Sequence, residues 1–408
     1  MTDTASPSPT RAEQIRVVAA GFISLCITSG IGYYVFPVYM GVFESELGWT
    51  LTEMSTALLV WGIVGTLVSP LCGRLIDRLG PRRVMIAGTL IQIVSVMVMW
   101  RATHLWQLYA ALILTSVANV ANTYVPVSAA VSNWFDKDRG KAFAIALFGL
   151  GVGGMAMSAI ANAFLEYGQW RDAYLFFAAL LVIELGVIVW GIRDRARAGA
   201  EIGKADVEAS EGVESSLSVA AAFGTRTFWT LGFGDGLAGL VFAVFNVHLV
   251  YFAVEAGMDQ TLAATAFGVF QLLQVLGIIV VGALADRFSL RALMTLSYGM
   301  PAIATLALFR VDFAALLFVF AIVAGFFGGG RTALYPLTLT HSFGTAHFGA
   351  IYGALNTFFM VGSAVGPLVA GYLHDRQGDY RLTLGLCVGL AGLSGILIAT
   401  MRNERPGA

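Results

Sequence analysis

Twelve long apolar runs constrain this chain more than any other feature. About 20 helical residues span the ~30 Å hydrocarbon core of a bilayer. The runs are too long and too continuously apolar for the alternating strands of a membrane barrel, and a helix satisfies its own backbone hydrogen bonds in lipid. The sequence therefore predicts an all-α membrane protein with spans at 17–40, 53–76, 84–100, 106–131, 141–165, 172–192, 227–252, 261–285, 291–309, 313–340, 348–372 and 380–400.

Composition excludes several other classes of protein. Hydrophobic residues make up 58% of the 408 residues and charged residues only 12%, too few to cover a soluble fold of this size. The net charge of -1 provides no basic surface for nucleic acid. Cys26, Cys72 and Cys387 lie inside apolar runs without metal-ligand spacing, and no P-loop or G-x-S-x-G motif occurs. We expect the protein to bind neither a metal nor a cofactor, and we expect that it is not an enzyme.

One connection differs from the short loops elsewhere. Residues 193–226 are charged, Ser-rich and poor in large apolar residues, which is typical of a solvated linker. It divides the chain into six-helix bundles at 1–192 and 227–408. With the N-terminus placed in the cytoplasm, eighteen of the 24 Lys and Arg residues lie on the cytoplasmic side and five outside. Both termini and the linker are therefore predicted to be cytoplasmic.

A short motif occurs twice at matched positions. Residues 73–78 and 282–287 both fit G-x-L-x-D-R, after the second span of each half. A repeat in register indicates two homologous halves, whereas one copy would be consistent with an ordinary basic loop. The acidic residues can pair with basic groups and release them when the halves move. The predicted gating residues are Gly73, Asp77, Arg78, Asp286 and Arg287.

With this repeat the chain resembles the major facilitator superfamily along its whole length, in two pseudo-symmetric six-helix bundles. Residues 133–145 (NWFDKDRGKAFAI) and 169–174 (QWRDAY) narrow the resemblance to the branch of monocarboxylate transporters and oxalate:formate antiporters. That branch implies transport of small carboxylates, with a proton or in exchange for another anion. It also implies that spans one, four, seven and ten line the cavity. The chain departs from the branch in having no arginine in span eight and no lysine in span eleven.

Arg331 in span ten is the sharpest candidate for substrate binding. An ionisable group in mid-span costs about 2.5–3.5 kcal/mol, and a guanidinium needs an anionic partner because it does not lose its proton. Gly325, Gly328, Gly329 and Gly330 leave room before it. The partner is either a substrate carboxylate, held bidentately, or a protein carboxylate in a structural salt bridge.

Three further ionisable residues lie within the spans. We hypothesise that Asp235 pairs with Arg331 when no substrate is bound and yields or takes a proton when an anion arrives; the alternative is a carboxylate that stabilises a helix start. His248 is a candidate for substrate contact or proton transfer, or a structural histidine. Glu184 in span six is interpreted as neutral or packed within the bundle and is not assigned a role.

Polar uncharged residues complete the predicted binding site, in which Tyr335 and Tyr124 would grip the carboxylate with Arg331. The resemblance supports both tyrosines. Helix–helix hydrogen bonding is the alternative for every one of these groups. The other predicted substrate-binding residues are Asn119, Asn122, Tyr33 and Asn356.

These features predict a secondary transporter of small organic anions, monocarboxylates, working by alternating access with protons. One cation among many aromatic side chains favours a monoanion with an apolar body. The alternatives are a multidrug or metabolite exporter of the same fold, an anion exchanger without proton coupling, a membrane enzyme, or a scaffold. We expect it in the plasma membrane, or the inner membrane of a bacterium, functional as a monomer.

Overall fold

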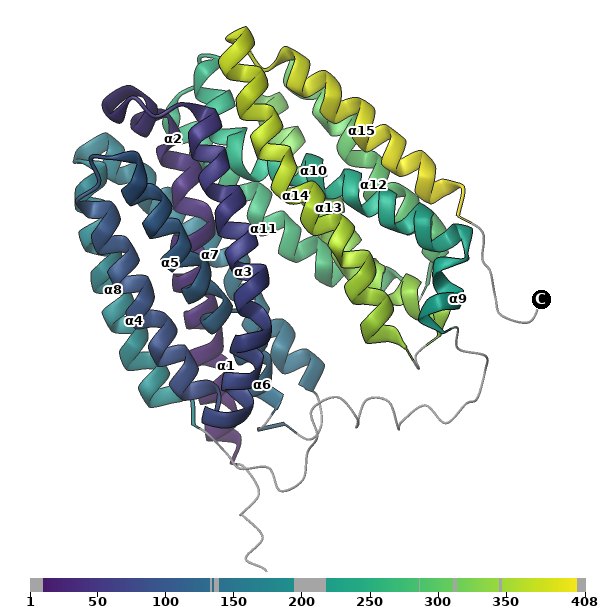
Figure 1. The fold of residues 1–408 in the computed structure, drawn as a ribbon, viewed down its shortest axis with the longest axis horizontal. Helices are drawn as coiled ribbons and strands as arrows, with labels where there is room; N and C mark the ends of the chain where they lie inside the picture. Colours follow the sequence, from purple (N-terminus) through teal and green to yellow (C-terminus); the bar gives the residue numbers. More distant parts are fainter. Residues whose placement is uncertain are drawn as a thin grey trace, which may run out of the picture. The chain divides into compact units, whose positions relative to one another are not determined.

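The computed structural model describes residues 10–132, 134–135, 139–193, 218–285, 287–310, 314–344 and 347–401. These residues form helices and connecting turns, and no strand occurs among them (Figure 1). The predicted all-α class is confirmed. The motif residues Asp286 and Asp136 to Asp138, and residues 194–217 of the expected linker, lie outside the described residues.

Twelve helical segments are long and apolar enough to cross a membrane, as the sequence predicts. Each overlaps one predicted span, and only the first and the eleventh extend beyond it by more than one helical turn. Their bounds are Arg11–Leu47, Leu51–Ile76, Pro81–Trp100, Leu105–Val131, Ala142–Tyr167, Trp170–Gly191, Arg226–Glu255, Gln260–Leu284, Leu290–Arg310, Ala314–Phe343, Ala350–Gln377 and Arg381–Ala399.

Contacts between residues group the chain into two compact units. The first contains the described residues of 1–35 and 60–198, and the second those of 36–59 and 199–408. Residues 36–59, which end the first span and begin the second, thus belong to the second unit. The predicted boundaries of the two bundles at 193–226 stay a prediction.

The elements of the first unit include two interrupted spans. Span one passes from α1 through a π-helical segment, η1, before continuing as α2, and span four breaks at Thr123 between α5 and α6. Thr10 begins α1 with a reciprocal capping box to Glu13. The elements are α1 (Arg11–Ser24), η1 (Leu25–Tyr34), α2 (Val35–Leu47), α3 (Leu51–Leu79), α4 (Pro81–Trp100), α5 (Leu105–Asn122), α6 (Tyr124–Ser132), α7 (Arg139–Tyr167) and α8 (Trp170–Gly191), with α2 and the start of α3 contributing to the second unit.

The second unit contains the remaining helices. Side chains of Thr225, Asp259 and Ser289 accept hydrogen bonds from the first turns of α10, α11 and α12, which sets where these helices begin. The elements are α9 (Val219–Phe223), α10 (Arg226–Glu255), α11 (Gln260–Leu284), α12 (Leu290–Ala307), η2 (Leu308–Arg310), α13 (Ala314–Phe343), α14 (Phe348–Gln377) and α15 (Arg381–Ala399).

The two halves repeat their helix pairings with an offset of six spans. In the first unit α4 packs against α5 and α8, and η1 packs against α7. In the second unit the corresponding helices do the same: α12 packs against α13 and α15, and α10 packs against α14. This recurrence is the structural counterpart of the repeated G-x-L-x-D-R motif.

Small residues explain the closest of these pairings. On α7, Gly149 and Gly153 lie against the carbonyl oxygens of Phe22 and Cys26, so that an added Cβ would overlap the facing backbone. On α14, Gly362 and Gly366 lie in the same way against the backbone of α10, at Gly236 and Leu240. Spans five and eleven thus each use a G-x-x-x-G contact, which lets helices approach closely in lipid.

Candidate functional site

Arg331 is buried within α13 and pairs with a carboxylate of α10. Its relative exposure is 9%, and that of Asp235 is 1%. The guanidinium Nη1 lies 2.5 Å from Asp235 Oδ1, within ion-pair and hydrogen-bond distance. A buried charge needs a partner of opposite sign, and each of these two residues supplies it to the other. The pair predicted from the sequence is therefore present in the structure.

Two aromatic residues complete the surroundings of this pair. The hydroxyl of Tyr298, on α12, donates to the same Asp235 Oδ1 at 2.8 Å. The ring of Phe359, on α14, lies 4.3 Å from the guanidinium carbon of Arg331, a cation–π contact. Four helices of the second unit thus meet at one ion pair.

A small cavity of about 40 Å³ opens beside Arg331. Water needs roughly 10–15 Å³ of such space, so the cavity has room for about three or four waters. Its walls are mainly apolar and aromatic: Ala238, Val241, Phe242, Phe245, Phe270, Pro301, Ala324, Gly328 and Ala391, with Ser297, Tyr298 and Arg331 as the polar members. A larger ligand would need the surrounding helices to move apart.

Two buried hydroxyls near the pair are not satisfied by the protein. Ser297 Oγ lines the cavity, and Tyr335 Oη lies one turn after Arg331 on the same helix; neither makes a hydrogen bond within the described part of the chain. Unpaired buried polar groups are costly and uncommon in native proteins. An anion at Arg331 is one kind of group that would accept from them.

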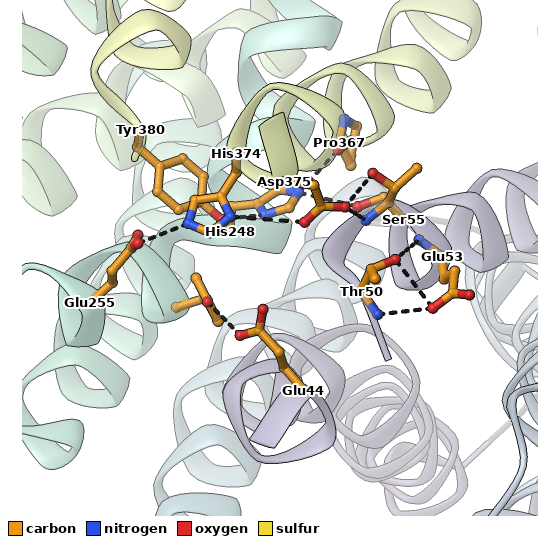
Figure 2. A network of polar contacts seen from close by, with 12 residues as sticks. Glu44, Thr50, Glu53, Ser55, His248, Glu255, Pro367, His374, Asp375 and Tyr380 are labelled. Carbon is orange, nitrogen blue, oxygen red and sulfur yellow. Dashed lines mark hydrogen bonds and ion pairs between the residues drawn. The ribbon is translucent and has the colours of Figure 1, made fainter. Parts of the chain in front are cut away.

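His248, on α10, is buried among three oxygen atoms (Figure 2). Its Nε2 lies 3.0 Å from the carbonyl oxygen of Pro367 and 3.3 Å from Ser55 Oγ, and its Nδ1 lies 2.8 Å from Tyr380 Oη. Because a carbonyl only accepts, Nε2 carries the hydrogen and Nδ1 accepts from the tyrosine. Burial raises the pKa of Tyr380, which keeps its hydroxyl protonated as the donor. Both ring nitrogens are satisfied, which favours the structural alternative for His248.

The network around His248 extends to the residues of 36–59 that belong to the second unit (Figure 2). Tyr251 donates to Glu44 on α2 at 2.5 Å, and the hydroxyl of Thr52 on α3 donates to Asp375 on α14, also at 2.5 Å. His374 Nε2 lies 2.8 Å from Glu255. Charge-assisted hydrogen bonds therefore join the start of α3 to α14 and the end of α2 to α10.

The predicted polar residues of the first unit have varied surroundings. Asn119 is buried, and neither atom of its amide has a hydrogen-bond partner among the described residues. Asn122 is fully buried and bonded to Thr89, an interhelical contact of the kind the sequence left open as an alternative. Tyr124 is 46% exposed, and Tyr33 is 37% exposed and packs edge-on against Trp61 with ring centroids 5.1 Å apart.

The remaining predicted residues lie in the second unit or in the repeated motif. Asn356 is half-buried on α14. Gly73 is half-buried within α3, Arg78 is exposed in the last turn of α3, and Arg287 is exposed in the turn that follows α11. The side chain of Asp77, like the whole of Asp286, is outside what the structure describes. The proposed ion pairs of the gating motif stay a prediction.

Sequence reasoning missed two residues of the site, Ser297 and Tyr298. Both belong to span nine, which lies outside the set of spans expected to line the cavity. Their polarity in an apolar helix was the available signal, because a tyrosine hydroxyl in a span needs an internal partner. Glu184 is fully buried against Ser24 and Thr28, as the interpretation of a bundle-packed residue expects.

Comparison with known proteins decides the family. The model of the Major Facilitator Superfamily matches residues 22–234 and 231–408, which together span nearly the whole chain. The chain belongs to this superfamily. It is therefore a transporter rather than an enzyme, a multi-pass membrane protein that acts on a small-molecule substrate.

Several known transporters align with this chain over most of their length. Monocarboxylate transporter 13 of Rattus norvegicus is 26% identical over 396 residues, covering 94% of this chain and 87% of the relative. The MFS transporter asaE of Aspergillus flavus is 23% identical over 352 residues, covering 84% and 76%. Monocarboxylate transporter 12 of Homo sapiens is 23% identical over 394 residues, covering 90% and 74%.

Proposed function

We propose that this transporter carries small organic anions, monocarboxylates, by alternating access, with a proton as the coupled ion. The observation that carries the proposal is Arg331, a buried guanidinium beside a cavity and two unpaired hydroxyls. The names of two of the aligned relatives, both monocarboxylate transporters, support the same substrate class.

The ion pair suggests how an anion would bind. Arg331 contacts Asp235 through one nitrogen and one oxygen, whereas a guanidinium can hold a carboxylate through two parallel hydrogen bonds. In the proposed cycle a substrate carboxylate replaces Asp235 on Arg331, with Ser297 and Tyr335 as further donors. The displaced Asp235 then takes up a proton, because an unpaired carboxylate in this buried place is unfavourable.

The cavity walls suggest which anions fit. A single guanidinium meets a monoanion, while a dianion would leave one charge unpaired. Phe242, Phe245 and Phe270 line the cavity beside Arg331 and offer contact to an apolar substrate body. We therefore expect branched or aromatic monocarboxylates to bind more tightly than oxalate or phosphate.

Counterflow in proteoliposomes tests the proposal. Proteoliposomes that contain the purified protein are loaded with one unlabelled monocarboxylate, and uptake of a labelled monocarboxylate is measured. The proteins compared are wild type, Arg331→Lys and the matched control Arg310→Lys at an exposed site. We expect Arg331→Lys to lower the apparent affinity about tenfold or more, since it keeps the charge and loses the planar fork. Equal counterflow by wild type and Arg331→Lys would refute the role of Arg331. If wild type shows no counterflow with any monocarboxylate, the proposed substrate class is refuted.

The remaining parts of the proposal come from the sequence. We propose that Tyr124, Tyr33, Asn119, Asn122 and Asn356 contribute to substrate binding, and that the two G-x-L-x-D-R motifs act in gating. The excess of basic residues on one side supports an orientation with both termini in the cytoplasm, in the plasma membrane. A monomer is expected to be the functional unit.

A further inference from the structure

A second buried carboxyl, Glu184, lies in the first unit. It occupies the interior of α8 on the stripe of buried residues that also contains Leu181 and Ile188. Its relative exposure is 0%. An ionised carboxylate at mid-span is unfavourable unless its charge is compensated, so this position requires either a partner or a proton.

Hydroxyl groups of span one are the partners of Glu184. Ser24 Oγ lies 2.8 Å from Glu184 Oε1, and Thr28 Oγ1 lies 2.7 Å from Oε1 and 2.9 Å from Oε2. No ion pair joins Glu184 to a basic side chain in the ranges that the structure describes. The site thus offers hydrogen bonds to the carboxyl without neutralising its charge.

The titratable groups packed around this carboxyl are few. Cys26 of η1 interacts electrostatically with Glu184. Two guanidinium groups lie farther along α8: Arg82 of α4 donates to the carbonyl oxygen of Val189, and Arg16 of α1 lies over the ring of Trp190. The polar residues of α4 on its buried face, Thr89, Gln92 and Ser95, are uncharged.

The hydroxyls can satisfy the carboxyl in both protonation states. Toward the carboxylate, each hydroxyl donates its hydrogen. When the carboxyl is protonated, the hydroxyl oxygen of Thr28 or Ser24 accepts a hydrogen bond from the carboxyl O–H. That hydroxyl then donates its own hydrogen to a backbone carbonyl of its helix, an arrangement common for Ser and Thr in spans. A lysine or arginine in their place would fix the carboxyl as an anion, whereas hydroxyls allow the proton to bind and leave.

The segment that carries Thr28 is itself unusual. Thr28 belongs to the π-helical stretch Leu25–Tyr34, and Ser24 immediately precedes it. π-helical turns are rare and are found frequently at functional sites. Protonation of Glu184 changes whether the hydroxyls of Ser24 and Thr28 donate to the carboxyl or to the backbone of span one. It therefore changes the hydrogen bonding of the segment that ends in Tyr33 and Tyr34.

We propose that Glu184 is a proton-binding site: one proton from water converts its carboxylate to the acid, held between Ser24 and Thr28. Its occupancy sets the hydrogen bonding of the π-helical segment of span one. The site supplies a pH response to the proposed transporter and in that respect rests on the proposed function. It is separate from the Arg331–Asp235 pair in the second unit.

Infrared difference spectroscopy on the full-length protein without substrate tests the site. Spectra at mildly acidic and mildly alkaline pH are subtracted, so that a carboxyl that gains a proton gives a carboxylic C=O band. We expect wild type to show a band that Glu184→Gln lacks and that Asp235→Asn retains. Thr28→Val, which removes one donor to the carboxylate, should move the midpoint of this band to higher pH, since the charged form loses stabilisation.

The outcomes separate this proposal from the transporter proposal. Coincident difference spectra of wild type and Glu184→Gln, with both proteins eluting as folded monodisperse species, would overturn the proton site. An unchanged midpoint in Thr28→Val would overturn the role of the hydroxyls. In counterflow, Glu184→Gln is expected to exchange substrate with a flattened pH profile, and a failure of wild-type counterflow would count against the proposed function while leaving the infrared result standing.

Discussion

Replacing Asp235 by Asn tests whether Arg331 is available to an external anion. The amide is close in size to the carboxylate and can still accept from Tyr298, so the change removes mainly the charge. Asp235 is 1% exposed and its Oδ1 lies 2.5 Å from Arg331 Nη1, so solvent does little to screen the pair. The variant leaves a buried guanidinium without its counter-charge.

The cost of this change follows from the geometry. Two unit charges about 4 Å apart interact by about 4 kcal/mol at an effective dielectric near 20. Removal of one member of a buried pair destabilises proteins by about 3–5 kcal/mol, since the other charge stays buried. The retained hydrogen bonds to Asn place the expected loss near the lower end, about 3 kcal/mol. An anion that binds Arg331 should restore much of it, about 2.7 kcal/mol at 100 times its dissociation constant.

Thermal unfolding monitored by tryptophan fluorescence measures both effects, since the chain has 8 Trp residues. We expect Asp235→Asn to melt well below wild type in chloride-free buffer and to be stabilised more strongly than wild type by monocarboxylates. The double variant Asp235→Asn/Arg331→Gln is the matched control: it lacks the uncompensated charge and should regain stability but lose the response to anions.

Two results would refute this reasoning. If Asp235→Asn melts like wild type, the pair does not hold the second unit together as the geometry implies. If monocarboxylates stabilise the single and double variants equally, the anion binds somewhere other than at Arg331.

Four further predictions concern packing, the histidine network, topology and coupling. Gly329→Ala should abolish folding, because its Cβ would overlap the carbonyl oxygen of Gln274, whereas Gly328→Ala, which faces open space, should fold normally; yields of monodisperse protein measure both. His248→Phe should lower the melting temperature through a loss of about 1–3 kcal/mol, since it leaves buried oxygen atoms unpaired; an unchanged melt would contradict the assignment of the network. In a background without native cysteines, Arg101→Cys should react with an impermeant maleimide added outside cells and Arg83→Cys should not; the reverse pattern would invert the topology. Uptake of monocarboxylates should be insensitive to an imposed membrane potential, and a measured current would exclude a coupling of one proton to one anion.

The sequence predicts most of the fold because transfer to lipid is dominated by composition over about 20 residues. A run such as 227–252 is apolar throughout, and no competing structure satisfies its backbone in a membrane. The interruptions at η1 and at Thr123 could not be predicted in this way. Hydropathy records neither of them. The break at Thr123 lies within one turn of Pro126, which lacks the backbone N–H needed to continue a helix, whereas η1 contains no proline.

The candidate site was predicted in part for a similar reason. Charges within spans must find partners, and Arg331 and Asp235 were the two opposite charges on spans expected to face one another. Tyr298 and Ser297 were not predicted, because neutral hydroxyls are tolerated in many helices and the contact of Tyr298 with Asp235 joins α12 to α10, helices that are distant in the sequence. The contacts of Ser55 with His248 join residues 193 positions apart, and nothing local in the sequence indicates them.

Charge neutrality links the site to its coupling ion. The pair of Arg331 and Asp235 carries no net charge. An anion that entered while Asp235 stayed ionised would bring the buried net charge to minus one, which the low-dielectric surroundings disfavour. An anion that enters with one proton on Asp235 keeps the net charge at zero, so the neutral pair becomes a neutral trio. One proton for each monoanion is therefore the ratio at which the buried charge is the same before and after binding, and uptake at that ratio moves no net charge across the membrane. Glu184 takes no part in this exchange, because no basic side chain among the described residues pairs with it, and its protonation follows the pH of the solution. Electroneutral uptake should accordingly persist in Glu184→Gln. In Asp235→Asn net uptake should be lost while exchange of anions remains, because this variant has no proton to release.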